Sequence, residues 1–339
     1  MENWLKPKWE TATVLTYYNY YTVADYQNGR NSGVSYEYRT TTNEGPFVTF
    51  HNGKYYLTYS ANNWKNNSYL VAQAISDNVL GPYTKLTEAE GGIVLSGVEQ
   101  GGKQSTGVGH HSIVSVGDQL FMVYHRHTNP YTGTVNDPSG DDHAKRNHAI
   151  DEIKWITVGG REVMYVNGPS AVLLPRVEKH SAYHNIAPEA TVSGSGNVRY
   201  LNDGLLSHLK SGASNVVNAV GETTITGTST FTFTFDEARA VKSIMVYNSR
   251  LENRIFREIA QIKLTCLENG KTVTKYIRAV PFNGEYYTVN SGGTVTYAEP
   301  CAAAYAIFDE QQVLSVEITV KLPAGQSNVG ISEIRILGK

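Results

Sequence analysis

Short segments in which apolar and polar residues alternate constrain the fold of this chain more than any other feature. Phe231, Phe233 and Phe235 alternate with threonines, and a second alternating run occupies 313–322. A period of two residues marks a strand with one buried face, because successive side chains of a strand point to opposite sides. No long window shows the 3.6-residue repeat of an amphipathic helix. The chain is therefore predicted to be all-β.

Two-residue turn signals separate several of these runs. They are Asn52-Gly53, Gly159-Gly160 and Asn269-Gly270. Asn and Gly tolerate the positive φ that both central residues of a type I′ turn require. Each pair predicts a β-hairpin.

One internal repeat is visible. When 48–60 is set over 113–125, Tyr59 falls on Tyr124 at a constant offset of 65 residues, and each unit continues into further strands. A repeat of about four strands has the size of one propeller blade. Two blades cannot close a ring and would leave their apolar faces uncovered, so we expect a partial β-propeller of about two blades.

The composition changes in 180–204, where Gly, Ser and Asn accumulate and the strand spacing alters. A chain of 339 residues is long enough for two domains with separate cores. We therefore predict a partial propeller in 1–180 and a single β-sandwich in 181–339.

Charge and hydropathy exclude several classes of protein. The net charge is −2 and no block of Lys or Arg occurs, so the electrostatic signature of a nucleic-acid-binding protein is missing. The longest apolar runs fall well short of the ~18 residues needed to span a bilayer, so no membrane segment is expected. Residues 1–10 contain no apolar core and do not form a signal peptide.

Two further features of the composition bear on function. Cys266 and Cys301 are too few for a disulfide framework, and they either pair with each other or stay free. The 23 tyrosines, against 9 Phe and 4 Trp, suit strands and offer flat faces with polar tips. That mixture is typical of an all-β protein that handles sugars, and also of any exposed sheet.

Three segments together resemble the second half of the catalytic domain of glycoside hydrolase family 43. They are EGPFVTFHNGKYYLTYS (44–60), AISDNVLGPY (74–83) and GVGHHSIVSVGDQLFMVYH (107–125), and the likeness covers roughly residues 40–175. The resemblance implies a five-bladed propeller that hydrolyses arabinose- and xylose-containing polysaccharides (arabinan, arabinoxylan, xylan) with inversion. It also implies a secreted or extracytoplasmic enzyme that needs no cofactor for its chemistry, with calcium as a candidate metal.

The Glu-Gly-Pro triplet implies the general acid. A sugar oxygen is a poor leaving group until a carboxylic acid protonates it, and the resemblance assigns that role to Glu44. Gly45 allows backbone and substrate to approach closely, and Pro46 stands at the start of a strand, where a missing N–H is tolerated. Without these neighbours Glu44 would be interpreted as a solvated loop residue.

The Gly-His-His element resembles the channel histidine of the family, which helps to hold a central metal ion in arabinan-cleaving members. We assign the metal to His110 and substrate contact to His111 and Trp64. The sequence does not separate the two histidines, either of which could cap a strand end. Trp64 and Tyr131 could stack on sugar rings or simply pack in loops.

Arg146, nine residues before Trp155, resembles the family arginine that contacts substrate or the catalytic carboxylates. A guanidinium holds a carboxylate or sugar hydroxyls through its fork of donors. A surface arginine is the alternative. The acidic loop 136–142 lacks a metal-binding ladder and is interpreted as a solvated loop.

The resemblance places the general base and a third aspartate upstream of the Glu-Gly-Pro strand. Only 43 residues precede Glu44, and their single aspartate, Asp25, stands in no recognisable motif. We therefore expect an N-terminally truncated form that lacks the base, in which 1–43 contains outer strands of a preceding blade. The alternative function is a non-catalytic carbohydrate-binding protein.

The second domain resembles the discoidin-like (coagulation-factor type C) sandwiches, which have a jelly-roll, galactose-binding-like fold. The likeness rests on 185–196, on Asn202-Asp203-Gly204 and on the closing 328–339. It implies sugar binding at one end of the sandwich and a structural calcium near the Asn-Asp-Gly loop. A purely structural spacer is the alternative.

Overall fold

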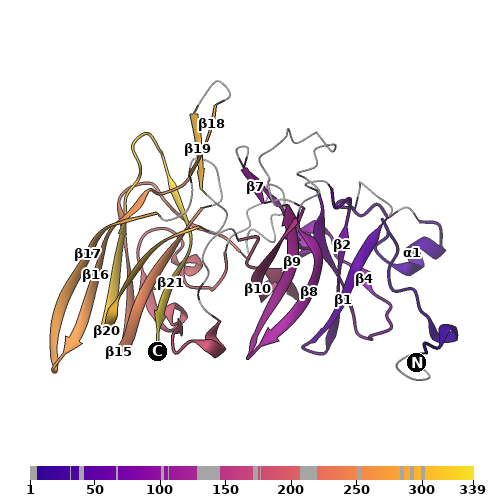
Figure 1. Ribbon diagram of the computed structural model, residues 1–339, viewed down its shortest axis with the longest axis horizontal. Helices are drawn as coiled ribbons and strands as arrows, with labels where there is room; N and C mark the ends of the chain where they lie inside the picture. Colours follow the sequence, from indigo (N-terminus) through magenta and orange to yellow (C-terminus); the bar gives the residue numbers. More distant parts are fainter. Residues whose placement is uncertain are drawn as a thin grey trace.

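The computed structural model describes residues 6–30, 32–37, 42–65, 68–100, 103–105, 107–127, 146–170, 175, 177–206, 220–249, 254–282, 286–290, 294–298 and 302–339. Strands dominate these ranges, whose single α-helix is the five-residue α1 (Val23–Gln27). Two sheets from the N-terminal part stand beside a larger sheet from the C-terminal part (Figure 1). The predicted all-β class is confirmed.

Two antiparallel sheets in succession form the N-terminal part, and they correspond to the two predicted blades. The first has the order β1-β2-β3-β4 with β5 beside β3, and the second has the order β11-β10-β9-β8. A two-stranded ribbon, β6 with β7, lies between them in the chain. The bounds are β1 Asn43–His51, β2 Lys54–Ala61, β3 Leu70–Ser76, β4 Thr84–Lys85, β5 Ile93–Ser96, β6 Val98–Gln100, β7 Lys103–Ser105, β8 Gly109–Val116, β9 Gln119–His127, β10 Arg146–Val158 and β11 Arg161–Val166.

All three predicted two-residue turns close hairpins. The pairs β1–β2, β10–β11 and β16–β17 end at His51↔Lys54, Val158↔Arg161 and Glu268↔Lys271. Both central residues of each turn have positive φ, from 45° to 80°. This is the type I′ requirement from which the turns were predicted.

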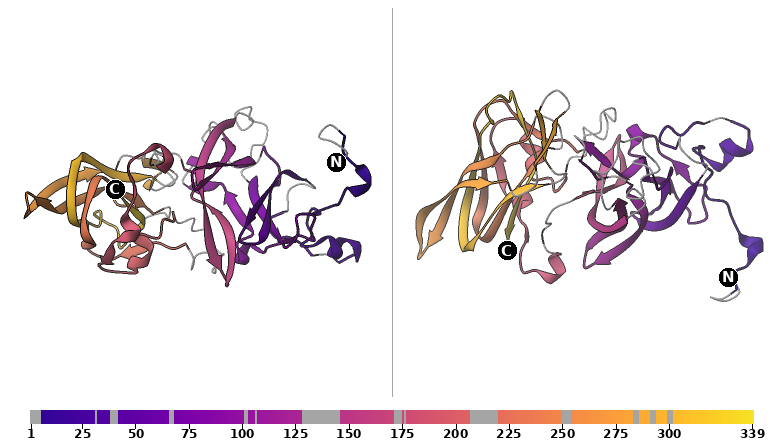
Figure 2. Two further views of the ribbon diagram at one scale, coloured as in Figure 1. Left: turned by 90° about the horizontal axis from the view of Figure 1, so that it is seen from below. Right: turned by 45° about the horizontal axis from the view of Figure 1, so that its top comes forward.

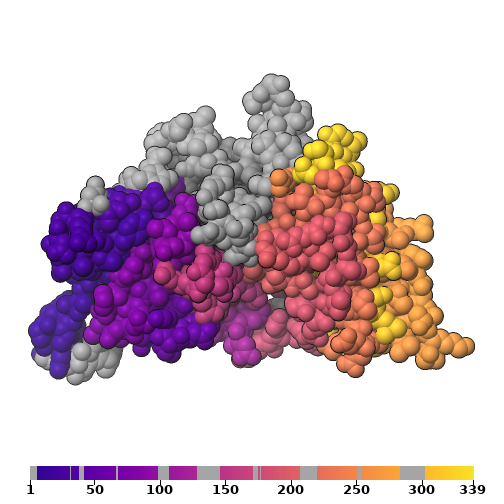
Figure 3. Space-filling model, turned by 180° about the vertical axis from the view of Figure 1, so that it is seen from behind, coloured from indigo at the N-terminus to yellow at the C-terminus, as the bar shows by residue number. Residues whose placement is uncertain are grey.

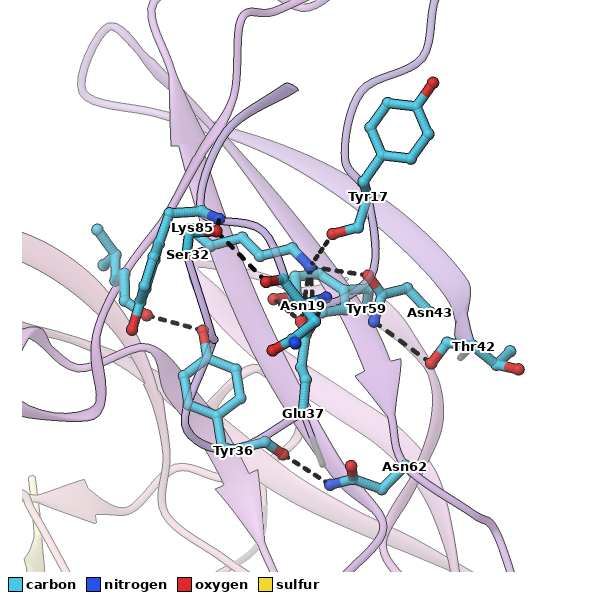
Figure 4. A network of polar contacts seen from close by, with 12 residues as sticks. Tyr17, Asn19, Ser32, Tyr36, Glu37, Thr42, Asn43, Tyr59, Asn62 and Lys85 are labelled. Atoms are coloured by element: carbon cyan, nitrogen blue, oxygen red, sulfur yellow. Dashed lines mark hydrogen bonds and ion pairs between the residues drawn. The ribbon is translucent and has the colours of Figure 1, made fainter. Parts of the chain in front are cut away.

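The N-terminal segment differs from expectation. Within 6–37 the described residues form the 3₁₀ helix η1 (Trp9–Thr11) and α1, and no strand of a preceding blade. A fully buried ion pair holds this segment to the first sheet: Lys85 Nζ lies 2.7 Å from Glu37 Oε1 (Figure 4). Lys85 also donates to the Tyr17 carbonyl and to Asn43 Oδ1, and the Tyr59 hydroxyl donates to Glu37. A buried charge network therefore occupies the place where we predicted outer strands.

The C-terminal part is a β-sandwich built on one long connected sheet, of order β12-β21-β15-β20-β16-β17 (Figure 2). The alternating Phe231, Phe233 and Phe235 face its core, as predicted, together with Val316 and Ile318 from β20. Register shifts bend β15 against β20, so that apolar residues of both halves of β15 reach the same core. The strands are β12 His184–Asn185, β13 Thr191–Ser193, β14 Thr223–Ile225, β15 Ser229–Asn248, β16 Glu258–Glu268, β17 Lys271–Pro281, β18 Tyr286–Asn290, β19 Thr294–Ala298, β20 Ala303–Val320 and β21 Val329–Gly338, with 3₁₀ helices η2 Glu88–Glu90, η4 Glu178–His180, η5 Ala187–Glu189 and η6 Val198–Leu201.

The two parts pack directly against each other (Figure 3). The Asn167 side chain donates to the Gly204 carbonyl (2.8 Å) and accepts from the Leu206 N–H (3.1 Å). The Tyr165 hydroxyl donates to the Leu206 carbonyl, and Val220 joins the apolar cluster of β10 and β11. The loop that carries the Asn-Asp-Gly motif thus also forms one of the contacts between the two parts.

Two remaining expectations concern cysteine and membrane. Cys266 is buried and carries a free thiol, whereas Cys301 lies outside the described residues. Among the residues that the structure covers, no helix has the length and apolar character to cross a membrane.

Candidate active site

A β-bulge presents Glu44. The pairing of β1 with β2 shifts register between Glu44 and Phe47, and Gly45 has a φ of 56°. A bulge bends the strand and redirects side chains. This bulge places residue 45 at positive φ, which glycine adopts without a Cβ penalty. The Glu-Gly-Pro triplet therefore forms a bend at the strand end rather than a regular start.

The second hairpin repeats this bulge at the same place. The pairing of β8 with β9 shifts register between Gly109 and Ser112, 65 residues beyond the first bulge. His110 takes the position of Gly45 and has a φ of 49°. Its N–H donates to Ser60 Oγ at 2.8 Å. The internal repeat thus extends to an irregularity that places Glu44 and His110 side by side.

Glu44 is held from one side. The Tyr69 hydroxyl donates to Glu44 Oε1 at 2.5 Å, and His110 Nδ1 lies 4.0 Å from the same oxygen. The Tyr69 ring is fully buried, and burial, followed by the bond to Glu44, raises the pKa of its phenol. Tyr69 therefore stays protonated and acts as a donor. About one third of the Glu44 side chain is exposed, so the carboxyl can meet a ligand.

Glycine at 109 makes the Tyr69 position available. A Cβ on Gly109 would lie 2.3 Å from the Tyr69 ring, well inside contact distance. The His125 imidazole stacks on the same Tyr69 ring, with 5.5 Å between the ring centroids. The Gly-His-His element thus supplies the space for Tyr69 as well as His110.

Arg146 begins β10 and lies between two aromatic partners. Its Nη1 donates to His125 Nε2 at 3.1 Å, and its Cζ stands 4.7 Å from the centre of the Trp64 ring. Burial, and then the neighbouring positive Arg146, lower the pKa of His125 to about 4. His125 is consequently neutral at pH 7, which leaves Nε2 able to accept. His127 Nε2 donates to the Trp64 carbonyl and fixes the Trp64 loop.

A pocket of about 460 Å³ opens beside these groups. Its lining side chains come from β8, β9 and β10: His110, Ser112, Val123, Tyr124, His125, Arg146, Asn147 and His148. Because Glu44 lies beside His110, the pocket and the carboxyl are adjacent.

His111 points the other way. It is buried, its Nε2 lies 2.6 Å from Thr58 Oγ1, and burial lowers its pKa to about 4. This placement gives His111 a packing role between β8 and β2. The structure therefore separates the two histidines that the sequence left equivalent.

A match to a known family covers this site. Residues 16–159 match the model of the glycosyl hydrolases family 43. This segment contains Glu44, His110 and Arg146. A β-D-galactofuranosidase (xynD) of Aspergillus niger is 31% identical over 125 residues, which are 37% of this chain and 32% of that protein. The chain thus spans about a third of the curated relative that it matches.

Solved structures of two kinds are similar to the chain over part of its length. A thermostable family-43 glycoside hydrolase is 34% identical over 39% of this chain and 38% of its own, with a TM-score of 0.32. An F5/8 type C domain from Bacteroides fragilis is 12% identical over 46% of this chain and 95% of its own, with a TM-score of 0.28.

The structure thus brings four predicted site residues to one region: Glu44, His110, Arg146 and Trp64. Sequence reasoning missed Tyr69 and His125, which join them. In the internal repeat His125 aligns with Ser60. A polar residue at this point near the end of both strands was the signal in the sequence that could have identified His125. Tyr131 and the loop 136–142 lie outside the described residues.

Proposed function

We propose that this chain carries the proton-donating part of an inverting glycoside hydrolase, with Glu44 as the general acid. The observation that carries the proposal is the Glu44 carboxyl, fixed by Tyr69 at a bulge beside a pocket, within a segment that matches family 43. Tyr69 occupies Oε1, which leaves Oε2 to deliver the proton to the leaving oxygen. Arg146 and Trp64 would hold the sugar.

The proposed substrates are arabinan, arabinoxylan and xylan, which implies action outside the cytoplasm. Inversion also needs a base roughly 6.5–9.5 Å from the acid to activate water. The proposal names no described residue as that base, so turnover by this chain alone is the first quantity to measure. The activity of the Aspergillus niger relative adds β-D-galactofuranosides to the panel of substrates.

The test compares leaving groups. A dinitrophenolate leaves without protonation, whereas a sugar alkoxide does not. Glu44→Gln should therefore slow hydrolysis of oligosaccharides by roughly 10²–10⁴ and hydrolysis of dinitrophenyl glycosides far less. Glu258→Gln, an exposed carboxylate on β16, is the matched control. Equal losses on both substrates would remove the acid role from Glu44.

Carbohydrate binding without turnover is the second candidate function. It is favoured by the assembled Arg146–Trp64 contact, which needs no second carboxylate to hold a sugar. If no glycoside is cleaved, and Arg146→Gln but not Glu44→Gln abolishes oligosaccharide binding, this function replaces the first.

We propose that the C-terminal part is a discoidin-like carbohydrate-binding module with a structural calcium at Asp203 and Glu333. Glu333 is fully buried, its Oε1 accepts from the Gly204 N–H (3.2 Å), and its Oε2 has no hydrogen-bond partner among the described residues. Burial, with Asp203 nearby, raises the pKa of Glu333 well above its usual range. Calcium takes such oxygen ligands, and Asp203 and Glu333 would supply two of them.

The metal assignment of His110 stays a prediction. In the described part of the chain, no group of three or more His, Cys, Asp or Glu side chains is arranged to hold a metal ion.

A further inference from the structure

The Arg146 guanidinium is held in place without a counter-ion from the part of the chain that the structure describes. Trp64 supports one face of its plane, and His125 takes one of its N–H groups. No carboxylate among the described residues forms an ion pair with Arg146. A guanidinium fixed by an aromatic ring and one neutral acceptor keeps most of its planar fork of donors available.

The pocket around Arg146 is lined by side chains that also suit a negatively charged ligand. Among the described residues that line it, none carries a carboxylate, and His110, His148 and Asn147 add nitrogen atoms that can donate. Hydroxyl groups of a neutral sugar would satisfy single donors but would leave the Arg146 charge unpaired. A carboxylate accepts two parallel N–H bonds from a guanidinium, which is the strongest pairing such a site can make.

We propose that this pocket binds the carboxylate of a uronic acid residue, so that the preferred ligand is an acidic rather than a neutral oligosaccharide. The inference rests on the proposed function, since it places an acidic sugar next to Glu44. The volume of about 460 Å³ leaves room for more than the carboxylate group alone. Glu44 lies on the His110 side of the pocket, with its Oε1 4.0 Å from His110 Nδ1.

Three ligands test the proposal by calorimetry on the full chain. They are xylotriose, the same trisaccharide with one glucuronosyl branch, and the methyl ester of that branched compound. We expect the free acid to bind at least tenfold more tightly than the ester, and the preference to weaken as salt rises. Equal affinity for acid and ester would overturn the proposal, because the ester keeps every hydroxyl and loses only the charge.

Two variants locate the effect. Arg146→Gln should abolish the preference for the acid, and Arg146→Lys should keep part of it because the charge remains while the fork is lost. Arg161→Gln, on the exposed end of β11, is the matched control and should change nothing. Retention of the full preference in Arg146→Gln would also overturn the proposal.

These measurements do not depend on turnover. Glu44→Gln should bind the acidic ligand as the parent does while it loses oligosaccharide hydrolysis. Unchanged hydrolysis in Glu44→Gln, with the acid preference retained, would count against the proposed hydrolase role of Glu44 alone. Tight binding of the acidic ligand by an inactive chain would support the uronate site and contradict the hydrolase. Hydrolysis of neutral sugars without any preference for the acid would support the hydrolase and contradict the uronate site.

Discussion

The buried pair Glu37–Lys85 makes a sharp stability prediction. Lys85→Met keeps the length of the side chain and removes its charge, which leaves the Glu37 carboxylate inside the protein with only the Tyr59 hydroxyl and the Asn19 N–H as partners among the described residues. Both side chains of the pair are fully shielded from water. Removing one partner of a buried pair typically destabilises a protein by about 3–5 kcal/mol. We expect a loss in that range.

A double variant that removes both charges tests whether the unpaired Glu37 carboxylate causes the loss of stability. In the double variant Glu37→Gln, Lys85→Met no charge is buried, and the new amide oxygen would still accept from Tyr59. We expect the double variant to recover at least about 2 kcal/mol of the single variant's loss, because replacing both members of a buried pair is often nearly neutral. Urea unfolding, followed by tryptophan fluorescence, measures each free energy.

An exposed pair in the same sheet is the control. Lys54 and Asp77 pair beside the β1–β2 turn, with 48% and 82% of their side chains exposed. Lys54→Met should cost less than about 1 kcal/mol. If Lys85→Met costs no more than Lys54→Met, or if the double variant is less stable than the single one, the buried charge is not what joins the N-terminal segment to the first sheet.

Three further predictions concern the site and the loop between the two parts. Tyr69→Phe removes the donor to Glu44 Oε1 and should slow oligosaccharide hydrolysis roughly tenfold or more while sparing dinitrophenyl glycosides, as initial rates would show; equal slowing would contradict it. Burial lowers the pKa of His111 from 6.5 to about 4, so between pH 6.5 and pH 4 the unfolded chain binds more protons than the folded one. The free energy of unfolding is therefore highest above pH 6.5 and falls by about 3 kcal/mol toward pH 4. In His111→Leu, urea unfolding at each pH should show a smaller fall over this range. Calcium removal should lower the melting temperature of the parent but not that of the double variant Asp203→Asn, Glu333→Gln. An unchanged melting temperature of the parent would exclude a structural ion there.

Local chemistry made part of this fold predictable from sequence. The Asn-Gly and Gly-Gly turns were predicted correctly because the residues themselves tolerate positive φ. Phe231 and Phe233 were predicted to be core residues because the period of two decides which face is buried. In each case the deciding interaction lies within a few residues of the chain.

Features set by contacts between strands were not predictable in the same way. Tyr69 reaches Glu44 across 25 positions of sequence, and only because Gly109, on a different sheet, leaves room for its ring. The N-terminal segment departs from prediction for the same reason. Its tyrosines favour strands, but the Glu37–Lys85 pair holds it in an irregular path.

The equivalence of Gly45 and His110 carries the most information about the site. Both occupy the positive-φ position of matching bulges, where glycine is free of strain and an L-residue with a Cβ typically loses about 1–2 kcal/mol. A histidine persists at such a position when its side chain contributes something that glycine lacks. His110 adds an imidazole between Glu44 and the pocket, 4.0 Å from the carboxyl oxygen that Tyr69 binds. The strained residue of the repeat is thus the one that joins the proposed acid to the proposed sugar site.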